Sequence, residues 1–450
     1  MNIKWQISKL RLVILAILLL MLAAALAPGA AAIGPPPPGG KVLVRGAAIH
    51  GANGIMFDAH DRLHVASVVG REILVMEPNT GKIIASLGPE LGVEGPDDLA
   101  FGPDGSLYWT SILTGDVGRL TPDGVFNSQF VAPGVNPITF SDDGRLFVAL
   151  DFLGDGLYEL DPALVNPPRP IVVATAENPL PLGFLNGMDW GPDDRLYGPI
   201  WTQGRIISID VDSCEGTDDP WADCDIQEEA GGFGIPAAVK FDSSDRLHTI
   251  DHLTGEVLRV DLATGARQTI AQLTPGLDNL AFDSLDQLFI SHAQDGSIQK
   301  ILPSGIPRTI SKSGIIAPGG VAVLPGLQGR ESVYIADVFT LREFDGRTGR
   351  PMALERNMLG ASDLIPPFTV AADGHNLVLT SWFDMAVQVW DPDTGQAIIT
   401  YHDMPVPLNA IGFQGDVVVS QLGTGSVARA SDGFPLATGL FVPTGLAATE

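Results

Sequence analysis

The sequence predicts an all-β fold, a β-propeller built from four-stranded blades. A segment of about 15 residues recurs along the chain, and most copies begin roughly 40–50 residues after the previous one. Each copy contains an apolar strand, a turn rich in Asp, Gly and Ser, and a second strand in which apolar and polar residues alternate. Two further strands complete each unit. This period and this strand pattern are typical of propeller blades.

Six copies of the segment are clear and the later ones are weaker. In "NGMDWGPDDRLYGPI" the first strand ends at Trp190, and a turn rich in Pro and Asp follows. The 52 glycines and 35 prolines of the 450-residue chain are spread along it, as many short strands joined by tight turns require. The clear copies begin at Asn53, Asp97, Asn136, Asn186, Ala237 and Asp278, and the weaker ones at Gly319, Pro366, Asn409 and Thr444.

Residues 1–32 have the features of a cleaved export signal. Lys4, Lys9 and Arg11 precede an apolar run, and small residues end it. The run has about 15 residues and a membrane span needs roughly 20, although an uncleaved anchor is the alternative. Cleavage would leave no membrane span in the mature chain and predicts a secreted or periplasmic protein. Residues 33–40, "IGPPPPGG", then form a stiff tether.

The repeats divide into two regions. Residues 41–306 contain the six clear copies and predict one closed, six-bladed propeller, in which residues 41–46 could supply the outer strand of the last blade. Residues 307–450 predict further blades, which form either a second, incomplete propeller or part of one larger ring. Because propellers usually have about four to eight blades, we favour the division into two.

The composition is strongly acidic, with a formal net charge of −27. Removal of residues 1–32 takes away three basic residues and no acidic one, so the charge moves from −27 to −30. Such a surface repels nucleic acids and anionic lipids, so we expect neither as a partner.

The chain has two cysteines, Cys214 and Cys224, in "DSCEGTDDPWADCD". In an exported protein, two cysteines this close in sequence predict a disulfide. The acidic residues of this loop could bind Ca²⁺, but their spacing does not match that of an EF-hand.

Short oxygen-bearing side chains occupy one equivalent position in most of the clear copies. This position precedes the innermost strand of each blade, so its side chain should point towards the propeller axis. Carboxylate and amide oxygens that converge in this way are typical Ca²⁺ or Mg²⁺ ligands. The alternative is that Asn and Asp merely favour the turns before these strands. The sequence predicts a metal site, with Ca²⁺ as the first choice of cation, at Asn53, Asp97, Asn136, Asn186 and Asp278, and a gap at Ala237.

The segment "FLNGMDWGPDDRLY" resembles the Asn-Gly-Leu-x-Trp-x-Pro-Asp-Gly motif of the senescence marker protein-30/gluconolactonase family. NHL-repeat proteins and strictosidine synthase-like and virginiamycin B lyase-like propellers share much of this pattern. The resemblance implies a six-bladed propeller with one axial divalent metal that acts on lactones and related esters. It implies that Asn186 and Asn136 are metal ligands. Asn53 stands where the family has a Glu, and Ala237 where it has an Asp, so two carboxylates are missing.

These observations favour two kinds of function. The first is a secreted, divalent-metal-dependent hydrolase of lactones or esters, for which the sequence identifies no catalytic residue. The second is a non-catalytic propeller that binds a protein, peptide or glycan at one mouth. His292 follows a second strand and could reach this mouth as a base. The sequence contains no G-x-S-x-G, H-E-x-x-H or P-loop motif.

Overall fold

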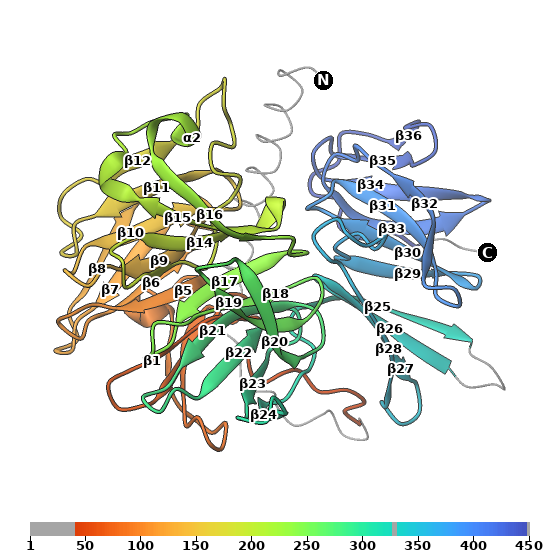
Figure 1. The fold of residues 1–450 in the computed structure, drawn as a ribbon. Helices are drawn as coiled ribbons and strands as arrows, with labels where there is room; N and C mark the ends of the chain where they lie inside the picture. The colour runs from red at the N-terminus through yellow and green to blue at the C-terminus, as the bar shows by residue number, and fades with distance from the viewer. Residues whose placement is uncertain (1–40, 326–330, 448–450) are drawn as a thin grey trace. The chain divides into compact units, whose positions relative to one another are not determined.

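The computed structural model describes residues 41–325 and 331–447, and within them it contains nine four-stranded antiparallel sheets (Figure 1). The predicted signal, residues 1–32, and the predicted tether, residues 33–40, lie outside the described residues. Each sheet is formed by four strands that follow one another in the sequence, which confirms the predicted all-β fold of propeller blades. Among the described residues, four short segments between strands are helical: η1 (Pro89–Leu91), η2 (Trp201–Gln203), η3 (Val211–Ser213) and α2 (Pro220–Asp223).

The chain separates into two compact units, which we call the N-terminal unit (residues 47–314) and the C-terminal unit (residues 315–450 with residues 1–46). Sheets are numbered here in chain order. In the N-terminal unit, sheet 1 contains β1 (Ala52–Phe57), β2 (Leu63–Ser67), β3 (Glu72–Met76) and β4 (Ile83–Leu87), and sheet 2 contains β5 (Pro96–Phe101), β6 (Leu107–Ser111), β7 (Asp116–Leu120) and β8 (Phe126–Phe130). Sheet 3 contains β9 (Val135–Phe140), β10 (Leu146–Leu150), β11 (Gly156–Leu160) and β12 (Arg169–Val173), and sheet 4 contains β13 (Asp189–Trp190), β14 (Leu196–Ile200), β15 (Arg205–Asp210) and β16 (Asp225–Gly231). Sheet 5 contains β17 (Pro236–Phe241), β18 (Leu247–Asp251), β19 (Glu256–Asp261) and β20 (Ala266–Gln272), and sheet 6 contains β21 (Leu277–Phe282), β22 (Leu288–His292), β23 (Ser297–Ile301) and β24 (Pro307–Ser311).

The described part of the C-terminal unit holds the remaining three sheets. They are sheet 7, β25 (Pro318–Pro325), β26 (Glu331–Asp337), β27 (Thr340–Asp345) and β28 (Pro351–Arg356); sheet 8, β29 (Thr369–Asp373), β30 (Asn376–Ser381), β31 (Ala386–Asp391) and β32 (Gln396–Tyr401); and sheet 9, β33 (Pro407–Phe413), β34 (Asp416–Gln421), β35 (Ser426–Arg429) and β36 (Pro435–Ala437). The tenth copy of the repeat, expected from Thr444, forms no strand within residues 444–447, and residues 448–450 lie outside the description.

In the N-terminal unit the sheets form a ring. The first strand of each sheet contacts the first strand of the next, in the order β1, β5, β9, β13, β17 and β21, and β21 contacts β1 in turn. Apolar side chains fill each junction between neighbouring sheets. At the junction of sheets 6 and 1, the buried side chains of Ile55 and Phe289 belong to one apolar cluster, and the rings of Phe57 and Phe289 meet edge to face at 5.0 Å.

The hairpin turn between the first two strands of each sheet in the N-terminal unit has a left-handed residue at its end. Gly105 (φ 79°) takes this position in sheet 2, but Asp61 (φ 55°) and Asp286 (φ 56°) take it in sheets 1 and 6. Asp tolerates this conformation better than most non-glycine residues, and here it gains a partner. Its carboxylate accepts hydrogen bonds from a serine of the preceding sheet, as Asp61 does from the backbone N–H of Ser284 at 2.9 Å.

Residues 41–46 do not supply the outer strand of the last sheet in the ring, contrary to the prediction. That strand is β24, which follows β23 through a short turn and lies beyond the predicted boundary at residue 306. A local hairpin loses less chain entropy than a return of the distant N-terminal segment. Gly46 instead forms a parallel bridge with Ile315, and Lys41 donates a hydrogen bond to the carbonyl of Arg347 in the C-terminal unit.

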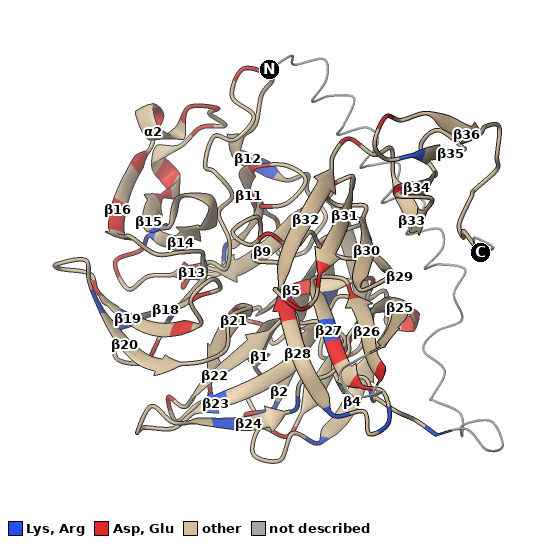
Figure 2. Ribbon diagram, turned by 90° about the vertical axis from the view of Figure 1, so that its right-hand side faces the viewer, with Lys and Arg blue, Asp and Glu red and all other residues tan. Residues whose placement is uncertain are grey.

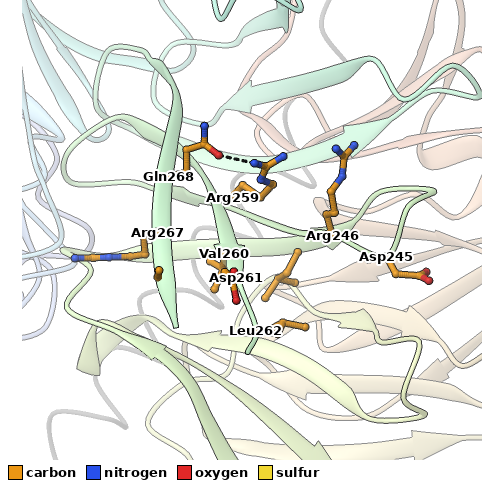
Figure 3. A pocket seen from close by; sticks show the side chains of 10 residues that line it. Asp245, Arg246, Arg259, Val260, Asp261, Leu262, Arg267 and Gln268 are labelled. Atoms are coloured by element: carbon orange, nitrogen blue, oxygen red, sulfur yellow. Dashed lines mark hydrogen bonds between the residues drawn. The ribbon is translucent and has the colours of Figure 1, made fainter. Parts of the chain in front are cut away.

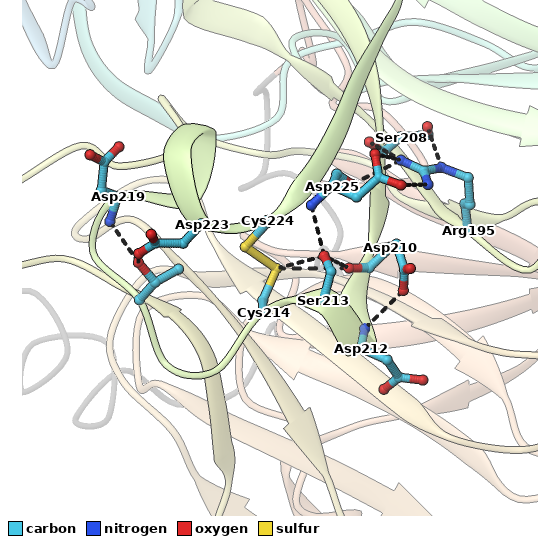
Figure 4. Close-up of a disulfide and its surroundings, with 11 residues drawn as sticks. Arg195, Ser208, Asp210, Asp212, Ser213, Cys214, Asp219, Asp223, Cys224 and Asp225 are labelled. Carbon is cyan, nitrogen blue, oxygen red and sulfur yellow. Dashed lines mark hydrogen bonds and ion pairs between the residues drawn. A yellow bond between two sulfur atoms is a disulfide. The ribbon is translucent and has the colours of Figure 1, made fainter.

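The predicted disulfide between Cys214 and Cys224 is present, with the two Cα atoms 5.0 Å apart (Figure 4). It closes the loop between β15 and β16. Two of the acidic side chains of this loop form ion pairs within the protein: Asp212 pairs with Arg145 at 2.8 Å and Asp225 pairs with Arg195 at 2.9 Å. This pairing leaves these two carboxylates poorly suited to bind Ca²⁺.

Candidate functional site

One end of the ring brings together the residues that the sequence analysis singled out. In each sheet the second strand runs antiparallel to the first, so the last residue of the second strand lies beside the start of the first. Leu277 pairs with His292 in this way, and Leu150 pairs with Val135. The end is therefore lined by two sets of side chains from each sheet, of which the sequence analysis considered mainly one.

The structure joins four of the five predicted residues in two hydrogen-bonded pairs. Asn53 Nδ2 donates to Asp97 Oδ1 at 2.9 Å, from sheet 1 to sheet 2. Asn136 Nδ2 donates to Asn186 Oδ1 at 3.3 Å and also to Asp151 Oδ2 at 2.9 Å. Asp151, which directly follows the second strand of sheet 3, was missed by the sequence analysis. We call the whole group the axial cluster, with the members Asn53, Asp97, Asn136, Asp151, Asn186 and Asp278.

The carboxyl groups of the axial cluster repel one another. Burial raises the pKa of Asp97 well above its usual range, and the charges of Asp278 and Asp151 raise this pKa further. Burial likewise raises the pKa of Asp278 to about 7, with a contribution from Asp98. The carboxyl groups of Asp97, Asp151 and Asp278, on sheets 2, 3 and 6, therefore interact electrostatically at this end of the ring. This interaction places Asp278 with the other predicted residues.

Asp151 corresponds to His252 in sheet 5, because its backbone N–H donates to the carbonyl of Gly134 as that of His252 donates to the carbonyl of Ile235. The imidazole of His252 contacts the carbonyl of Leu277, with its Nδ1 2.8 Å away. Asp151 Oδ2 is held by Asn136, but its buried Oδ1 has no hydrogen-bond partner among the described residues. Burial raises the pKa of Asp151 well above its usual range, and its hydrogen bond with Asn136 opposes this shift. A carboxyl group at this position is therefore a feature of sheet 3 that sheet 5 does not share.

A second polar layer, one residue further along the first strands, was also missed. Asp98 Oδ1 accepts a hydrogen bond from Asn279 Nδ2 at 3.1 Å, and its Oδ2 accepts one from the backbone N–H of Ile138 at 3.1 Å. Sheet 1 lies between sheets 2 and 6, and its residue at this level is Gly54. A Cβ atom at Gly54 would lie 2.6 Å from Asp98 Oδ1, so the glycine makes room for the link between Asp98 and Asn279. The doublets Asp97-Asp98 and Asp278-Asn279 were the sequence signal for this layer.

The Asn-Gly pair at Asn186 has a structural role of its own. Asn186 Oδ1 accepts a hydrogen bond from the backbone N–H of Gly187 at 2.7 Å. A Cβ atom at Gly187 would lie 2.3 Å from the Cβ of Ala238, and the Gly187 carbonyl accepts a hydrogen bond from Val239 N at 2.8 Å. The glycine is therefore required for close contact between sheets 4 and 5. Ala237 is buried and adds no oxygen to the cluster.

The donor atoms of the axial cluster fit a hard cation better than a transition metal. All side-chain donors are carboxyl or amide oxygens, which suit Ca²⁺ and Mg²⁺. In the described residues, no three His, Cys, Asp or Glu side chains form a group that could hold a metal ion. A cation would therefore depend on the amide oxygens of Asn53 and Asn136 in addition to the carboxylates of Asp97 and Asp278. The repulsion between these carboxylates is relieved by a bound cation or by shared protons.

His292 is not placed as a freely accessible base. Its side chain is buried, its Nε2 lies 2.7 Å from the carbonyl of Pro275, and its Nδ1 lies 3.4 Å from Asp295 Oδ1. His252 contacts the same loop, with its Nδ1 2.8 Å from the carbonyl of Leu277. These two imidazoles hold the loop that leads into β21.

A separate pocket of about 530 Å³ lies at the opposite end of sheet 5, where β18 begins (Figure 3). Its arginines already have partners. Arg246 pairs with Asp242 at 2.7 Å, and Arg267 donates to the carbonyl of Gly232 at 2.6 Å. Acidic residues elsewhere are spread over many strands and turns (Figure 2). The described residues include no helix with the length and apolar character needed to cross a membrane.

Comparison with known proteins finds similar solved structures at low sequence identity. No family model and no curated protein sequence matches the chain. Among solved structures, a streptogramin B lyase has a TM-score of 0.45 and 14% identity over 66% of this chain and 93% of its own. A putative gluconolactonase has a TM-score of 0.44 and 12% identity, over 61% of this chain and 92% of its own. A gluconolactonase from Xanthomonas campestris has a TM-score of 0.42 and 18% identity, over 56% and 85%.

These similarities concern the fold alone, and they identify no functional residue of this chain. The chemistry of this chain has to be argued from its own axial cluster.

Proposed function

We propose that this chain is a hydrolase of lactones or small esters and that the axial cluster is its active centre. The observation that carries the proposal is the convergence of carboxyl groups with raised pKa values at one end of the ring. Carboxyl groups in the turns of the same unit are shifted the other way, as hydrogen bonds with Arg246 and His248 hold the pKa of Asp242 at about 2. Groups whose charged form is disfavoured by burial and like charges are enriched at active sites.

We further propose that a divalent cation, in the first place Ca²⁺, binds to the oxygens of Asn53, Asp97, Asn136, Asn186 and Asp278. When bound, such an ion polarises a carbonyl oxygen and lowers the pKa of a bound water. Hydrogen bonds already orient these ligands, since Asn53 is tied to Asp97 and Asn136 to Asn186. The excess of negative charge at this end of the ring favours retention of the cation.

Asp151 is the residue that we propose as the proton acceptor. Asn136 Nδ2 fixes the orientation of the carboxyl group through Oδ2, and the buried Oδ1, which has no hydrogen-bond partner among the described residues, would accept a hydrogen bond from a water or a substrate hydroxyl. Its raised pKa makes the carboxylate a stronger base than an exposed Asp, so that it can take a proton from the attacking water and return it to the leaving oxygen. General acid–base groups of this kind contribute about 10²–10⁴-fold to the rate of a reaction.

The test is hydrolysis of a panel of lactones and aryl esters, with added Ca²⁺ and with a chelator. Asp151→Asn should lower kcat by about 100-fold or more, and Ca²⁺ should still raise the melting temperature of this variant. Asp97→Asn and Asp278→Asn should lose the stabilisation by Ca²⁺. Asp245→Asn, in an outer turn of the same unit, is the matched control and should change neither property. A wild-type protein that Ca²⁺ stabilises but that hydrolyses none of these compounds would instead favour a non-catalytic binding propeller.

We also propose that the protein is exported, to the cell exterior or the periplasm. The disulfide between Cys214 and Cys224 supports this location, because oxidising compartments preserve such bonds. The mass of the mature protein and its N-terminal sequence provide the test, and we expect the mature chain to begin at Ile33.

A further inference from the structure

The backbone of Asn186 is held differently from that of the other predicted members of the axial cluster. The other four lie within first strands of six residues, where the ladder to the second strand fixes the backbone. In sheet 4 the first strand, β13 (Asp189–Trp190), begins only after Asn186. There one bridge joins Leu185 to Ile200, and Asn186 N donates to the carbonyl of Pro199 at 3.0 Å. The position of Asn186 therefore depends on the segment that precedes it.

The carboxylate of Asp155 holds this preceding segment. Its Oδ2 accepts hydrogen bonds from the backbone N–H groups of Leu182 at 2.8 Å and Gly183 at 2.7 Å. Asp155 is 1% exposed, so these bonds lie out of water, where the loss of a partner costs most. Asp155 lies between two strands of sheet 3, whereas the segment leads into sheet 4. The carboxylate thus joins the two sheets beside the axial cluster.

Two further contacts fix the same segment. The hydroxyl of Thr202 donates to the carbonyl of Gly183 at 2.6 Å. The rings of Phe184 and Trp201 are stacked, with their centroids 5.6 Å apart. Phe184 has a φ of 68°, a left-handed conformation that is unfavourable for a bulky residue and persists only where its surroundings impose it. The segment is therefore held in place against the preference of its own backbone.

Asp155 and Asp151 lie in the same short loop between β10 and β11. Asn136 donates both to Asp151 at 2.9 Å and to Asn186 at 3.3 Å. The loop that carries the proposed proton acceptor and the segment that carries a proposed cation ligand are therefore joined twice. One connection runs through the side chain of Asn136, and the other runs through the carboxylate of Asp155.

We propose that Asp155 is a positioning residue, which sets where Asn186 Oδ1 lies relative to Asn136 and Asp151. This role rests on the function proposed above, because it concerns the same cluster. Asp155 itself would contact neither the cation nor the substrate, and it acts through the backbone of residues 182–186. Removal of such an outer partner typically lowers metal affinity by about 10–100-fold.

Sheet 5 supplies the matched control. There the carboxylate of Asp251 accepts hydrogen bonds from the backbone N–H groups of Gly234 at 2.6 Å and Ile235 at 3.1 Å. Asp251 is 2% exposed, so its replacement should disturb the fold about as much as replacement of Asp155. The segment that Asp251 holds leads to Ala237, which adds no oxygen to the cluster.

The first test is the affinity for Ca²⁺, measured by calorimetry on the metal-free full chain. Asp155→Ala should weaken binding by about 10–100-fold, and Asp251→Ala should leave it unchanged. Saturating Ca²⁺ should restore kcat in Asp155→Ala, because the carboxyl group of Asp151 is still present, but not in Asp151→Asn. Equal affinities in the two alanine variants would overturn the proposal.

The second test uses a milder variant. Thr202 is exposed, so Thr202→Val removes its hydrogen bond to Gly183 with little risk to folding. It should weaken Ca²⁺ binding by about 2–10-fold, as expected for the loss of one hydrogen bond. If Asp155→Ala does not fold, this variant decides, and an affinity equal to that of the wild type overturns the proposal.

The third test needs no cation. A crystal structure of metal-free Asp155→Ala should show Asn186 Oδ1 beyond hydrogen-bond distance of Asn136, and the same pair should stay intact in Asp251→Ala. If the wild-type protein binds no Ca²⁺, the proposed cation is wrong, and this structure alone decides the role of Asp155. An Asn186 that keeps its place beside Asn136 would overturn that role.

Discussion

The two units of this chain are built from the same kind of sheet but differ in how many neighbours each sheet has. In the N-terminal unit the series of sheets returns to its start, and an apolar cluster fills every junction. In the described part of the C-terminal unit only the middle sheet is covered on both faces. Because each sheet in a repeat protein is stabilised mainly by its neighbours, sheets with the same arrangement of four strands do not all have the same stability.

The most direct test of this difference is to shorten the apolar side chain at the same position of the repeat in both units. Ile55→Ala should lower the free energy of unfolding of the N-terminal unit by about 2–5 kcal/mol, because it leaves a cavity between sheets 1 and 6. Val321→Ala should change the stability of the C-terminal unit by less than about 0.5 kcal/mol, because the side chain of Val321 is 63% exposed. Denaturation in urea measures both effects. Equal losses would mean that the two side chains are equally buried.

A second test concerns the covalent link, which only the N-terminal unit has. Replacement of Cys214 and Cys224 by Ser should lower the stability of that unit by about 2–3 kcal/mol, since it removes a constraint on the unfolded chain. The unfolding transition of the C-terminal unit should not move. A shift of both transitions by the same amount would show that the two units unfold as one.

A third test uses the raised pKa of Asp278, which is about 7 in the folded protein against an ordinary value of 3.8. Between these values the folded state holds a proton that the unfolded state has released, so stability decreases as the pH rises. Without divalent cations, the N-terminal unit should lose about 1–3 kcal/mol between about pH 5 and pH 7. Asp278→Asn should reduce this dependence, and Asp97 and Asp151, whose pKa values are also raised, should account for the remainder. A pH dependence that is unchanged in the variant would contradict the assignment.

The smallest expected effect concerns the contact between sheets 4 and 5. Gly187→Ala should cost about 1–2 kcal/mol, because the new methyl group would overlap with Ala238 and force the first strands apart. Gly445→Ala in the C-terminal unit is the control, since no atom lies within 4 Å of a Cβ atom placed there. Thermal melting of the two variants distinguishes a requirement for close packing from a general effect of glycine replacement.

Much of the fold could be predicted from the sequence because it depends on local patterns. Alternation of apolar residues and the Asp- and Gly-containing turns specify each hairpin, and the spacing of the copies specifies the series of sheets. The prediction for the outer strand of sheet 6 was wrong because it also relied on a local pattern. Residues 41–46 have the pattern of a strand, but pattern alone does not show which sheet edge is already occupied by β24.

The axial cluster was predicted only in part. Asn53, Asp97, Asn136, Asn186 and Asp278 were found because they share a position relative to the repeat. Asp151 lies at the end of a second strand, and only the antiparallel register brings it beside Asn136. Asp98 and Asn279 are 181 positions apart in the sequence. Their hydrogen bond could not be predicted without the knowledge that sheets 2 and 6 approach each other across Gly54.

The construction of every sheet from consecutive strands has a consequence for the connectivity of the ring. No strand is shared between sheets, so the chain can be cut between any two sheets without removal of a strand from its partners. The two ends of the N-terminal unit also lie beside the same turn. Gly314 donates a hydrogen bond to the carbonyl of Asp295, and a Cβ atom at the adjacent Gly296 would lie 3.0 Å from that of Ala47. The unit therefore suits circular permutation, in which a short linker joins these ends and any of the other connections between sheets supplies the new termini.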